Sequence, residues 1–361
     1  MASRIIRVFV TFVLLASTLP FIVGAGNAGN GDAARAEHQR IIEFWTPERV
    51  AQAVPRDFVF DPGTGRFSPT KGKPDGTPGG GGGNGGGGGE EDSTLVSGAS
   101  WNAGGQIDGA VGKVLFQMDG SYWVCSATVI ADANSTAREK TRSLILTAAH
   151  CVFDETNDQF ASEWMFIPDY DDQPASLTTS GTFCVNTRYG CWTASELAVH
   201  TGYATAGSFS DGLEFDFAVV AVGDGGKLDS QLDATVNAQQ YDFSDTAVAS
   251  GEDTYAFGYP AQKKWKGNDL IYCRGPIDTD PINNGDTYRL NGCKLNGGSS
   301  GGAWLTPFDL DGFGAGTVVS VNSYGYRGID AMHGPKLNSD TQAVYTAVLG
   351  VLIEGTNAIA R

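Results

Sequence analysis

The sequence predicts an all-β body that ends in an α-helix. From about Thr94 onward, short runs of alternating apolar and polar residues are separated by Gly, Asp and Asn, a pattern typical of a β-sandwich or β-barrel. The runs that we expect to be strands are residues 110–118, 122–130, 143–146, 164–167, 217–222, 254–257 and 317–323. Near the C-terminus, Val344, Val348 and Leu352 recur at helical spacing, which predicts a helix over about residues 340–355 with Asp340 as its cap.

The first residues have the pattern of an export signal. Arg4 and Arg7 precede a mostly apolar stretch over residues 8–23, and small residues follow it. We therefore expect a signal peptide over residues 1–25, with Ala28 as an alternative cleavage site. The alternative is an uncleaved membrane anchor, but the stretch is short for a spanning helix and is interrupted by polar residues and a proline. We expect a secreted, extracellular protein with no stable membrane association after cleavage.

A pre-segment over residues 26–78 separates the signal from a glycine-rich linker over residues 79–93. Thr46 followed by Pro47 is typical of a helix N-terminus, so we expect a small helix there. The linker is almost unbroken glycine, which buries nothing and behaves as a tether. We expect the pre-segment to be a propeptide that is cut away, the alternative being that the linker is a plain spacer of the mature protein.

Composition limits the partners of the chain. Its 361 residues carry a net charge of −17, which argues against nucleic-acid binding because phosphates would repel it. The six cysteines fit an oxidising compartment. Their spacing suggests three local pairs, although sequence alone permits fifteen connectivities. The suggested pairs are Cys125 with Cys151, Cys184 with Cys191, and Cys273 with Cys293.

Two short blocks carry the chemistry. A strand-like run leads into Thr147-Ala148-Ala149-His150-Cys151, and about 150 residues later comes Gly297-Gly298-Ser299-Ser300-Gly301-Gly302. A histidine that precedes a serine held among glycines has the order and local chemistry of a serine peptidase. The blocks resemble the two signatures of the chymotrypsin/trypsin-like serine peptidases, in the secreted bacterial, glutamyl-endopeptidase-like (V8-like) branch. This resemblance implies a domain over residues 94–361.

The resemblance assigns catalytic roles to three residues in the family's order. Ser300, immediately before the paired glycines, would be the nucleophile, and His150 its general base. Asp216 precedes an apolar strand and would orient His150, with Asp211 and Glu214 as alternatives. The backbone amides of Gly298 and Ser300 would form the oxyanion hole.

The resemblance also implies where an extended substrate binds. Ser323, Tyr324 and Gly325 match the segment that pairs with the residues before the scissile bond, and the base of the specificity pocket would come from Lys294 and Asn296. Relatives specific for Lys or Arg have Asp where this chain has Lys294. The glutamate-specific branch usually has His where it has Asn322.

The implied fold is two Greek-key six-stranded β-barrels (trypsin-like) followed by a C-terminal α-helix. We expect the first barrel over about residues 97–226, the second over about 228–345, and the active site between them. Animal trypsins carry an Asp where this chain has Ser299, so any control of activation must work through the pre-segment. We expect a monomeric endopeptidase that acts on proteins or peptides without a metal or other cofactor. The alternatives are a non-catalytic binding protein on the same fold and a secreted esterase.

Overall fold

The computed structural model describes residues 28–69, 95–132, 142–170, 183–261, 264–349 and 358–360. The expected signal peptide and glycine-rich linker lie outside these residues. Within the described part of the chain, no helix is both long and apolar enough to cross a membrane.

Six strands close into a first barrel. Their order around it is β6-β5-β10-β11-β12-β7, and β7 pairs back onto β6. Branched residues alternate along its strands: Val114, Ile145 and Val220 lie on one face of the sheet by their register and are fully buried. The strands are β5 (Val111–Met118), β6 (Ser121–Ile130), β7 (Ser143–Thr147), β10 (Ser162–Pro168), β11 (Trp192–His200) and β12 (Ala218–Val222).

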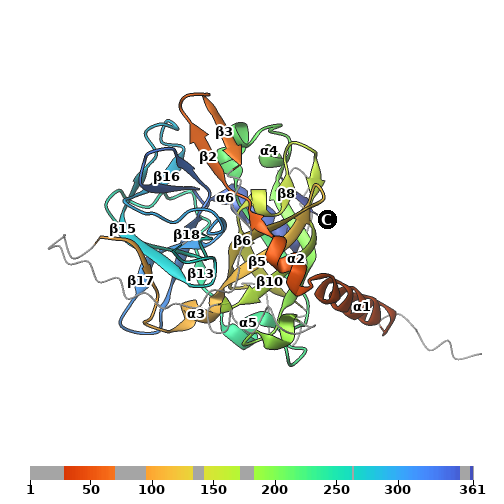
Figure 1. Cartoon of the computed structure of the whole chain (residues 1–361). Coiled ribbons are helices and arrows are strands. Elements are labelled where there is room, and N and C mark those ends of the chain that lie inside the picture. The colour runs from red at the N-terminus through yellow and green to blue at the C-terminus, as the bar shows by residue number, and fades with distance from the viewer. Residues whose placement is uncertain are drawn as a thin grey trace, which may run out of the picture.

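A second large sheet forms the other half of the molecule (Figure 1). Its main strands are β14 (Asp253–Gly258), β15 (Ile271–Thr279), β16 (Thr287–Asn291), β17 (Ala303–Asp309), β18 (Ala315–Val321) and β20 (Ala331–Pro335). The prediction of a two-barrel, trypsin-like fold is confirmed. One strand differs from the expected division: β4 (Val96–Ser100) pairs with β15 in this sheet, so Ser97 does not begin the first barrel.

The C-terminal helix is confirmed, but its cap is not the predicted one. Helix α6 spans Ser339–Val348, and the side chain of Asn338 accepts hydrogen bonds from the backbone N–H of Asp340 and Thr341. Asn338 is therefore the N-cap residue, because its side-chain oxygen accepts the free backbone N–H groups of the first turn. Asp340 lies inside that turn and contributes one of these N–H groups. Residues 350–357 lie outside the described residues.

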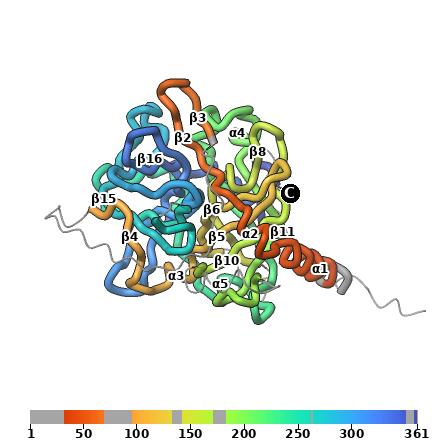
Figure 2. Tube along the Cα trace, in the orientation of Figure 1, coloured from red at the N-terminus to blue at the C-terminus, as the bar shows by residue number. Residues whose placement is uncertain are grey.

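The pre-segment is folded onto both halves of the molecule. It contains α1 (Ala28–Phe44), α2 (Pro47–Gln52), β1 (Val54–Pro55), β2 (Phe58–Asp61) and β3 (Arg66–Pro69). As predicted, Thr46 caps α2 through a hydrogen bond from the Arg49 N–H. Strand β1 pairs with β6 of the first barrel, and β2 pairs in parallel with β19 (Tyr324–Tyr326) of the second sheet. Figure 2 shows this orange segment running between the two halves.

Shorter elements complete the chain. They are α3 (Gln106–Ala110), η1 (Ala149–Cys151), β8 (Phe153–Asp154), β9 (Gln159–Phe160), η3 (Phe183–Asn186), α4 (Thr201–Ala204), η4 (Phe209–Phe215), α5 (Leu232–Val236), β13 (Gln240–Tyr241) and β21 (Ala358–Ala360).

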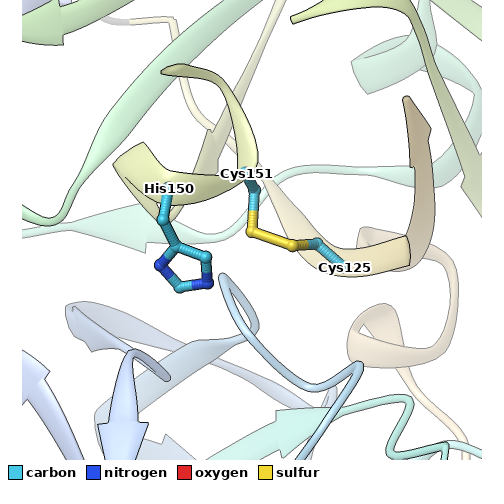
Figure 3. Close-up of side chains that lie close together, drawn as sticks. All are labelled: Cys125, His150 and Cys151. Carbon is cyan, nitrogen blue, oxygen red and sulfur yellow. A yellow bond between two sulfur atoms is a disulfide. The ribbon is translucent and has the colours of Figure 1, made fainter. Parts of the chain in front are cut away.

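Three disulfides join the cysteines in the local pairs that their spacing suggested. They are Cys125–Cys151, Cys184–Cys191 and Cys273–Cys293. The first bond joins β6 to η1, the single turn that carries His150, as Figure 3 shows. It therefore fixes that turn against the barrel.

Replacing both cysteines of this bond should destabilise the protein. The bond closes a loop of 26 residues, and removing such a closure costs about 3 kcal/mol, mainly because the unfolded chain gains freedom. We expect Cys125→Ser/Cys151→Ser to lower the free energy of unfolding by this amount in urea titrations. An unchanged transition midpoint would contradict the structural role of the bond.

Candidate active site

A buried carboxylate holds the predicted base. Asp216 follows η4 directly and is fully buried, like His150. Its Oδ2 lies 2.8 Å from His150 Nδ1, and its Oδ1 accepts the His150 backbone N–H at 2.9 Å. Ser323 Oγ also donates to Oδ2. Burial disfavours its charge, yet the neighbouring His150 and these hydrogen bonds hold the pKa of Asp216 below its usual value.

The hydrogen bonds of Asp216 leave one ring nitrogen of His150 for chemistry. Nε2 is buried and makes no hydrogen bond within the described structure. The His150 ring is packed edge-on by Phe58 of the pre-segment, at 5.5 Å between centroids, and by Phe209, at 5.6 Å. The geometry can hold the imidazole in a single orientation.

The serine loop packs directly against the histidine block. Gly301 has φ +84°, and a Cβ there would lie 2.1 Å from Thr147 Oγ1, so only glycine fits between the two blocks. Ser126 connects the same elements, because its N–H donates to the Ser300 carbonyl at 2.7 Å and its Oγ to the Gly298 carbonyl at 2.8 Å. Gly298 adopts φ +95° in the turn that we expect to form the oxyanion hole.

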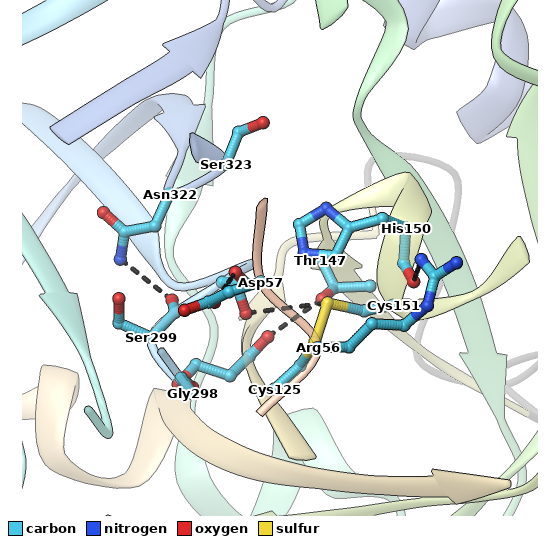
Figure 4. Close-up of a disulfide and its surroundings, with 12 residues drawn as sticks. Arg56, Asp57, Cys125, Thr147, His150, Cys151, Gly298, Ser299, Asn322 and Ser323 are labelled. Carbon is cyan, nitrogen blue, oxygen red and sulfur yellow. Dashed lines mark hydrogen bonds between the residues drawn. A yellow bond between two sulfur atoms is a disulfide. The ribbon is translucent and has the colours of Figure 1, made fainter. Parts of the chain in front are cut away.

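The two adjacent serines differ in their contacts. Ser299 Oγ donates to the Asn296 carbonyl at 2.7 Å, inside its own loop. Ser300 Oγ instead donates to the carboxylate Oδ1 of Asp57 at 2.7 Å. Figure 4 shows Asp57 of the pre-segment lying between the serine loop and His150. In this form of the chain the Ser300 hydroxyl is therefore engaged by the pre-segment.

The neighbours of Asp57 anchor it from both sides. The Arg56 N–H donates to the Val124 carbonyl of β6 at 3.3 Å, and its guanidinium donates to the His150 carbonyl. The Phe58 ring stacks on Phe209 at 3.9 Å between centroids. The pre-segment thus fills the space next to both Ser300 and His150.

The predicted substrate-pairing segment is already paired. Ser323 points to Asp216, while Tyr324 and Gly325 lie in β19 opposite Phe58 and Val59 of β2. An added strand therefore does form on this edge, and the pre-segment supplies it.

The residues expected at the pocket base have separate environments. Lys294 is half-exposed and pairs with Asp330 at 3.3 Å. Asn296 contributes its carbonyl to the Ser299 hydroxyl. The Asn322 amide is fully used inside the loop, since Nδ2 donates to the Phe257 and Ser299 carbonyls and Oδ1 accepts from Trp304 Nε1. Asn322 thus braces the serine loop, and we assign it no contact with substrate.

A buried polar network supports β19 from behind. The hydroxyls of Tyr324 and Tyr326 donate to Asp280 Oδ2 at 2.8 and 2.6 Å. His333 stacks on Tyr324, with its Nε2 3.9 Å from Asp280 Oδ1. These contacts give His333 a structural role. Burial lowers the pKa of His333 to about 4 despite the nearby carboxylate.

One cluster of metal-ligand types lies here, formed by Cys125, His150 and Cys151. Both sulfurs are joined in a disulfide (Figure 3), so neither is a thiolate. His150 already binds Asp216 through Nδ1. These atoms do not fit a metal site.

Solved structures of known proteins share the fold of this chain. The chain resembles the crystal structure of the protease Anisep from Arthrobacter nicotinovorans, with 28% identity, a TM-score of 0.54, and coverage of 67% of this chain and 96% of that one. It also resembles AL20, a thermostable serine protease from an extremophilic microorganism, with 29% identity, a TM-score of 0.54, and coverage of 68% and 100%.

A Glu endopeptidase structure shares the fold at 18% identity and a TM-score of 0.50, covering 71% of this chain and 97% of that one. No family model and no curated protein sequence matches the chain. The resemblance thus supports a trypsin-like serine peptidase fold, whereas the V8-like branch stays an expectation.

Sequence reasoning missed Asp57, the residue that contacts the predicted nucleophile. A signal was present, because Val54-Pro55-Arg56-Asp57-Phe58-Val59-Phe60 combines extended-chain residues with two charges before the linker. Nothing in that pattern names the partner, which lies 243 residues away.

Stability should fall as the pH falls through the acidic range, and His333 should contribute to the loss. Its pKa is about 4 in the folded chain and 6.5 when unperturbed, so between these values only the unfolded chain binds the proton. The free energy of unfolding should therefore decrease by about 3 kcal/mol from pH 6.5 to pH 4 because of this group. Urea titrations of wild type and His333→Gln should diverge below pH 6.5, and parallel curves would refute the assignment.

Asp280 contributes at lower pH than His333. Burial disfavours its charge, but hydrogen bonds from Tyr326, the Ile282 N–H and Tyr324, together with the nearby His333, hold its pKa below the usual value. Its stabilising contribution is therefore present above the usual carboxyl pKa and is lost as the pH falls below it.

Proposed function

We propose that this chain is the precursor of a secreted serine endopeptidase. The observation that carries the proposal is the pair of hydrogen bonds from His150 to buried Asp216, beside a glycine-flanked serine, in a chain that resembles serine proteases. The three disulfides support export to an oxidising compartment. The non-catalytic alternative has no comparable supporting contact.

The proposed reaction gives each of these residues a defined role in acylation. Ser300 Oγ attacks the carbonyl carbon of the scissile peptide bond while His150 Nε2 takes the hydroxyl proton. Asp216 stabilises the imidazolium that forms, and the amides of Gly298 and Ser300 stabilise the oxyanion. His150 then returns the proton to the leaving amine, which gives an acyl-enzyme. Water, activated in the same way by His150, hydrolyses this ester and regenerates Ser300.

We further propose that the pre-segment keeps the precursor inactive. Asp57 accepts the hydrogen bond that the Ser300 hydroxyl would otherwise give to His150, and its carboxylate lies next to the atom that the substrate carbonyl must approach. Strand β2 also fills the edge where we expect substrate to bind. Activation then requires removal of this segment, which suits a cut in the glycine-rich linker.

The nucleophile is tested by covalent labelling. A fluorophosphonate probe should modify the processed protein at Ser300, and Ser300→Ala should lower kcat by at least about a thousandfold without changing the fold. Ser299→Ala is the matched control, because the Ser299 hydroxyl bonds only within its loop, and it should still be labelled at Ser300. Labelling at Ser299 would overturn the assignment.

The role of Asp57 is tested in the uncut chain. Asp57→Ala should raise the rate at which the probe labels full-length protein by at least about tenfold, because a hydrogen bond to a charged acceptor no longer engages Ser300. The control is Asp61→Ala, which removes a carboxylate at the far end of β2 that pairs with Arg327 instead. Equal labelling rates for all three proteins would show that Asp57 does not restrain the nucleophile.

A further inference from the structure

Arg56 occupies a pocket that the body of the molecule builds around its guanidinium. One nitrogen donates to the His150 carbonyl, and another lies 3.3 Å from Glu155 Oε2 and 3.8 Å from Asp154 Oδ1. The hydroxyl of Tyr203, which is fully buried, donates to Glu155 Oε2 at 3.0 Å. The Arg56 side chain is only 8% exposed, so the pocket encloses it almost completely.

The walls of this pocket do not depend on the pre-segment. Asp154 is held by the N–H groups of Thr156 and Asn157 and by the Asn157 side chain, at 3.1, 3.2 and 2.8 Å. Glu155 is held by Tyr203 of α4. The pre-segment supplies only the Arg56 side chain and the Phe58 ring, which lies 5.3 Å from the guanidinium carbon. Removal of the pre-segment therefore leaves a preformed acceptor site.

The acceptor set favours a guanidinium over other cations. Two nearly buried carboxylates are unfavourable without a positive partner, so the site gains when a cation enters it. A carbonyl and a carboxylate that contact two different nitrogens of one planar group match the fork of an arginine better than the compact ammonium of a lysine.

The place of the pocket relative to Ser300 defines which substrate residue would reach it. Asp57 lies at Ser300, and Arg56 lies next to it on the β6 side, where its N–H bonds to the Val124 carbonyl. The β19 edge, assigned by resemblance to residues before the scissile bond, lies on the Phe58 side. The Arg56 pocket is therefore on the side of the residue that follows the scissile bond.

We propose that the pocket formed by the His150 carbonyl, Asp154, Glu155 and Tyr203 is a guanidinium-binding site of the processed enzyme, which selects arginine directly after the scissile bond. This inference rests on the proposed peptidase function. In the precursor, Arg56 occupies the pocket in place of a substrate arginine.

Paired peptides test the selection. The processed, secreted protein should cleave a peptide with arginine after the scissile bond with a kcat/KM at least about tenfold higher than its norleucine analogue, with lysine between them. Glu155→Gln should reduce the arginine-to-norleucine ratio by about tenfold. Asp158→Asn removes an exposed carboxylate from the same loop and should keep the ratio. Equal kcat/KM for arginine and norleucine in the wild-type protein would overturn the proposal, whether or not Glu155→Gln folds.

A second measurement tests the pocket without catalysis. Arg56→Ala in the full chain should bind ethylguanidinium, which should raise its Tm by a few degrees at about ten times the Kd. Ethylammonium should raise it less, and the unaltered chain, whose pocket is filled, should not respond. Equal responses of Arg56→Ala and wild type, or of the two cations, would refute a guanidinium site.

The two measurements separate the proposals. If no peptide is cleaved and no probe labels Ser300, the peptidase function is wrong, whereas a rise in the Tm of Arg56→Ala with ethylguanidinium would still support a cation-binding pocket. If peptides are cleaved equally with arginine or norleucine and ethylguanidinium does not raise this Tm, only the pocket proposal is wrong.

Discussion

The rest of the site depends on how the charge of Asp216 is satisfied. A buried carboxylate without partners would cost several kcal/mol, so its donors must stay in place for the chain to fold. Those donors come from different parts of the molecule: two from His150 on the first barrel and one from Ser323 next to β19 of the second sheet. One charge therefore orients the imidazole and holds the two halves in register. Ser323 leads directly into β19, the strand that pairs with β2. The Asp216 carboxylate therefore fixes the position of this strand together with that of the His150 ring.

A second constraint is the close approach of the serine loop to the barrel. Gly301 lets the loop meet Thr147, and Ser126 bonds both sides of the turn. Asn322 braces the same loop from within the second sheet. Ser300 is thus held by packing and by backbone hydrogen bonds before any substrate arrives, as a preorganised site requires. The pre-segment adds to this framework, because Arg56 contacts Val124 and His150 on one side and Phe58 stacks on Phe209 on the other.

Local patterns predicted most of the first barrel and the two blocks of the site. Strands such as β5 and β6 alternate clearly, and the residues around His150 and Ser300 are distinctive over five or six positions. The cap of α6 was misplaced by two residues, because Asn338 and Asp340 have similar capping ability and only the backbone path separates them. The pairing of β4 with β15 and the contact of Asp57 with Ser300 depend on chain segments that are distant in sequence. The alternation of residue types along one segment does not identify its distant partner, so these contacts could not be predicted from the sequence alone.

The described part of the pre-segment ends at Pro69, and the next described residue is Leu95. About 25 residues therefore connect the pre-segment to the body of the molecule, whose Ser300 and His150 it contacts. For the tether that the glycine-rich composition predicts, the expected root-mean-square span is about 30 Å, and short flexible linkers give local concentrations in the millimolar range. While the connection is intact, both parts belong to one molecule, so the occupancy of the site beside Ser300 does not depend on how much protein is present. The proposed cut in the linker would turn the pre-segment into a separate molecule. Its occupancy would then follow the bulk concentration, and dilution of the cut protein would release it.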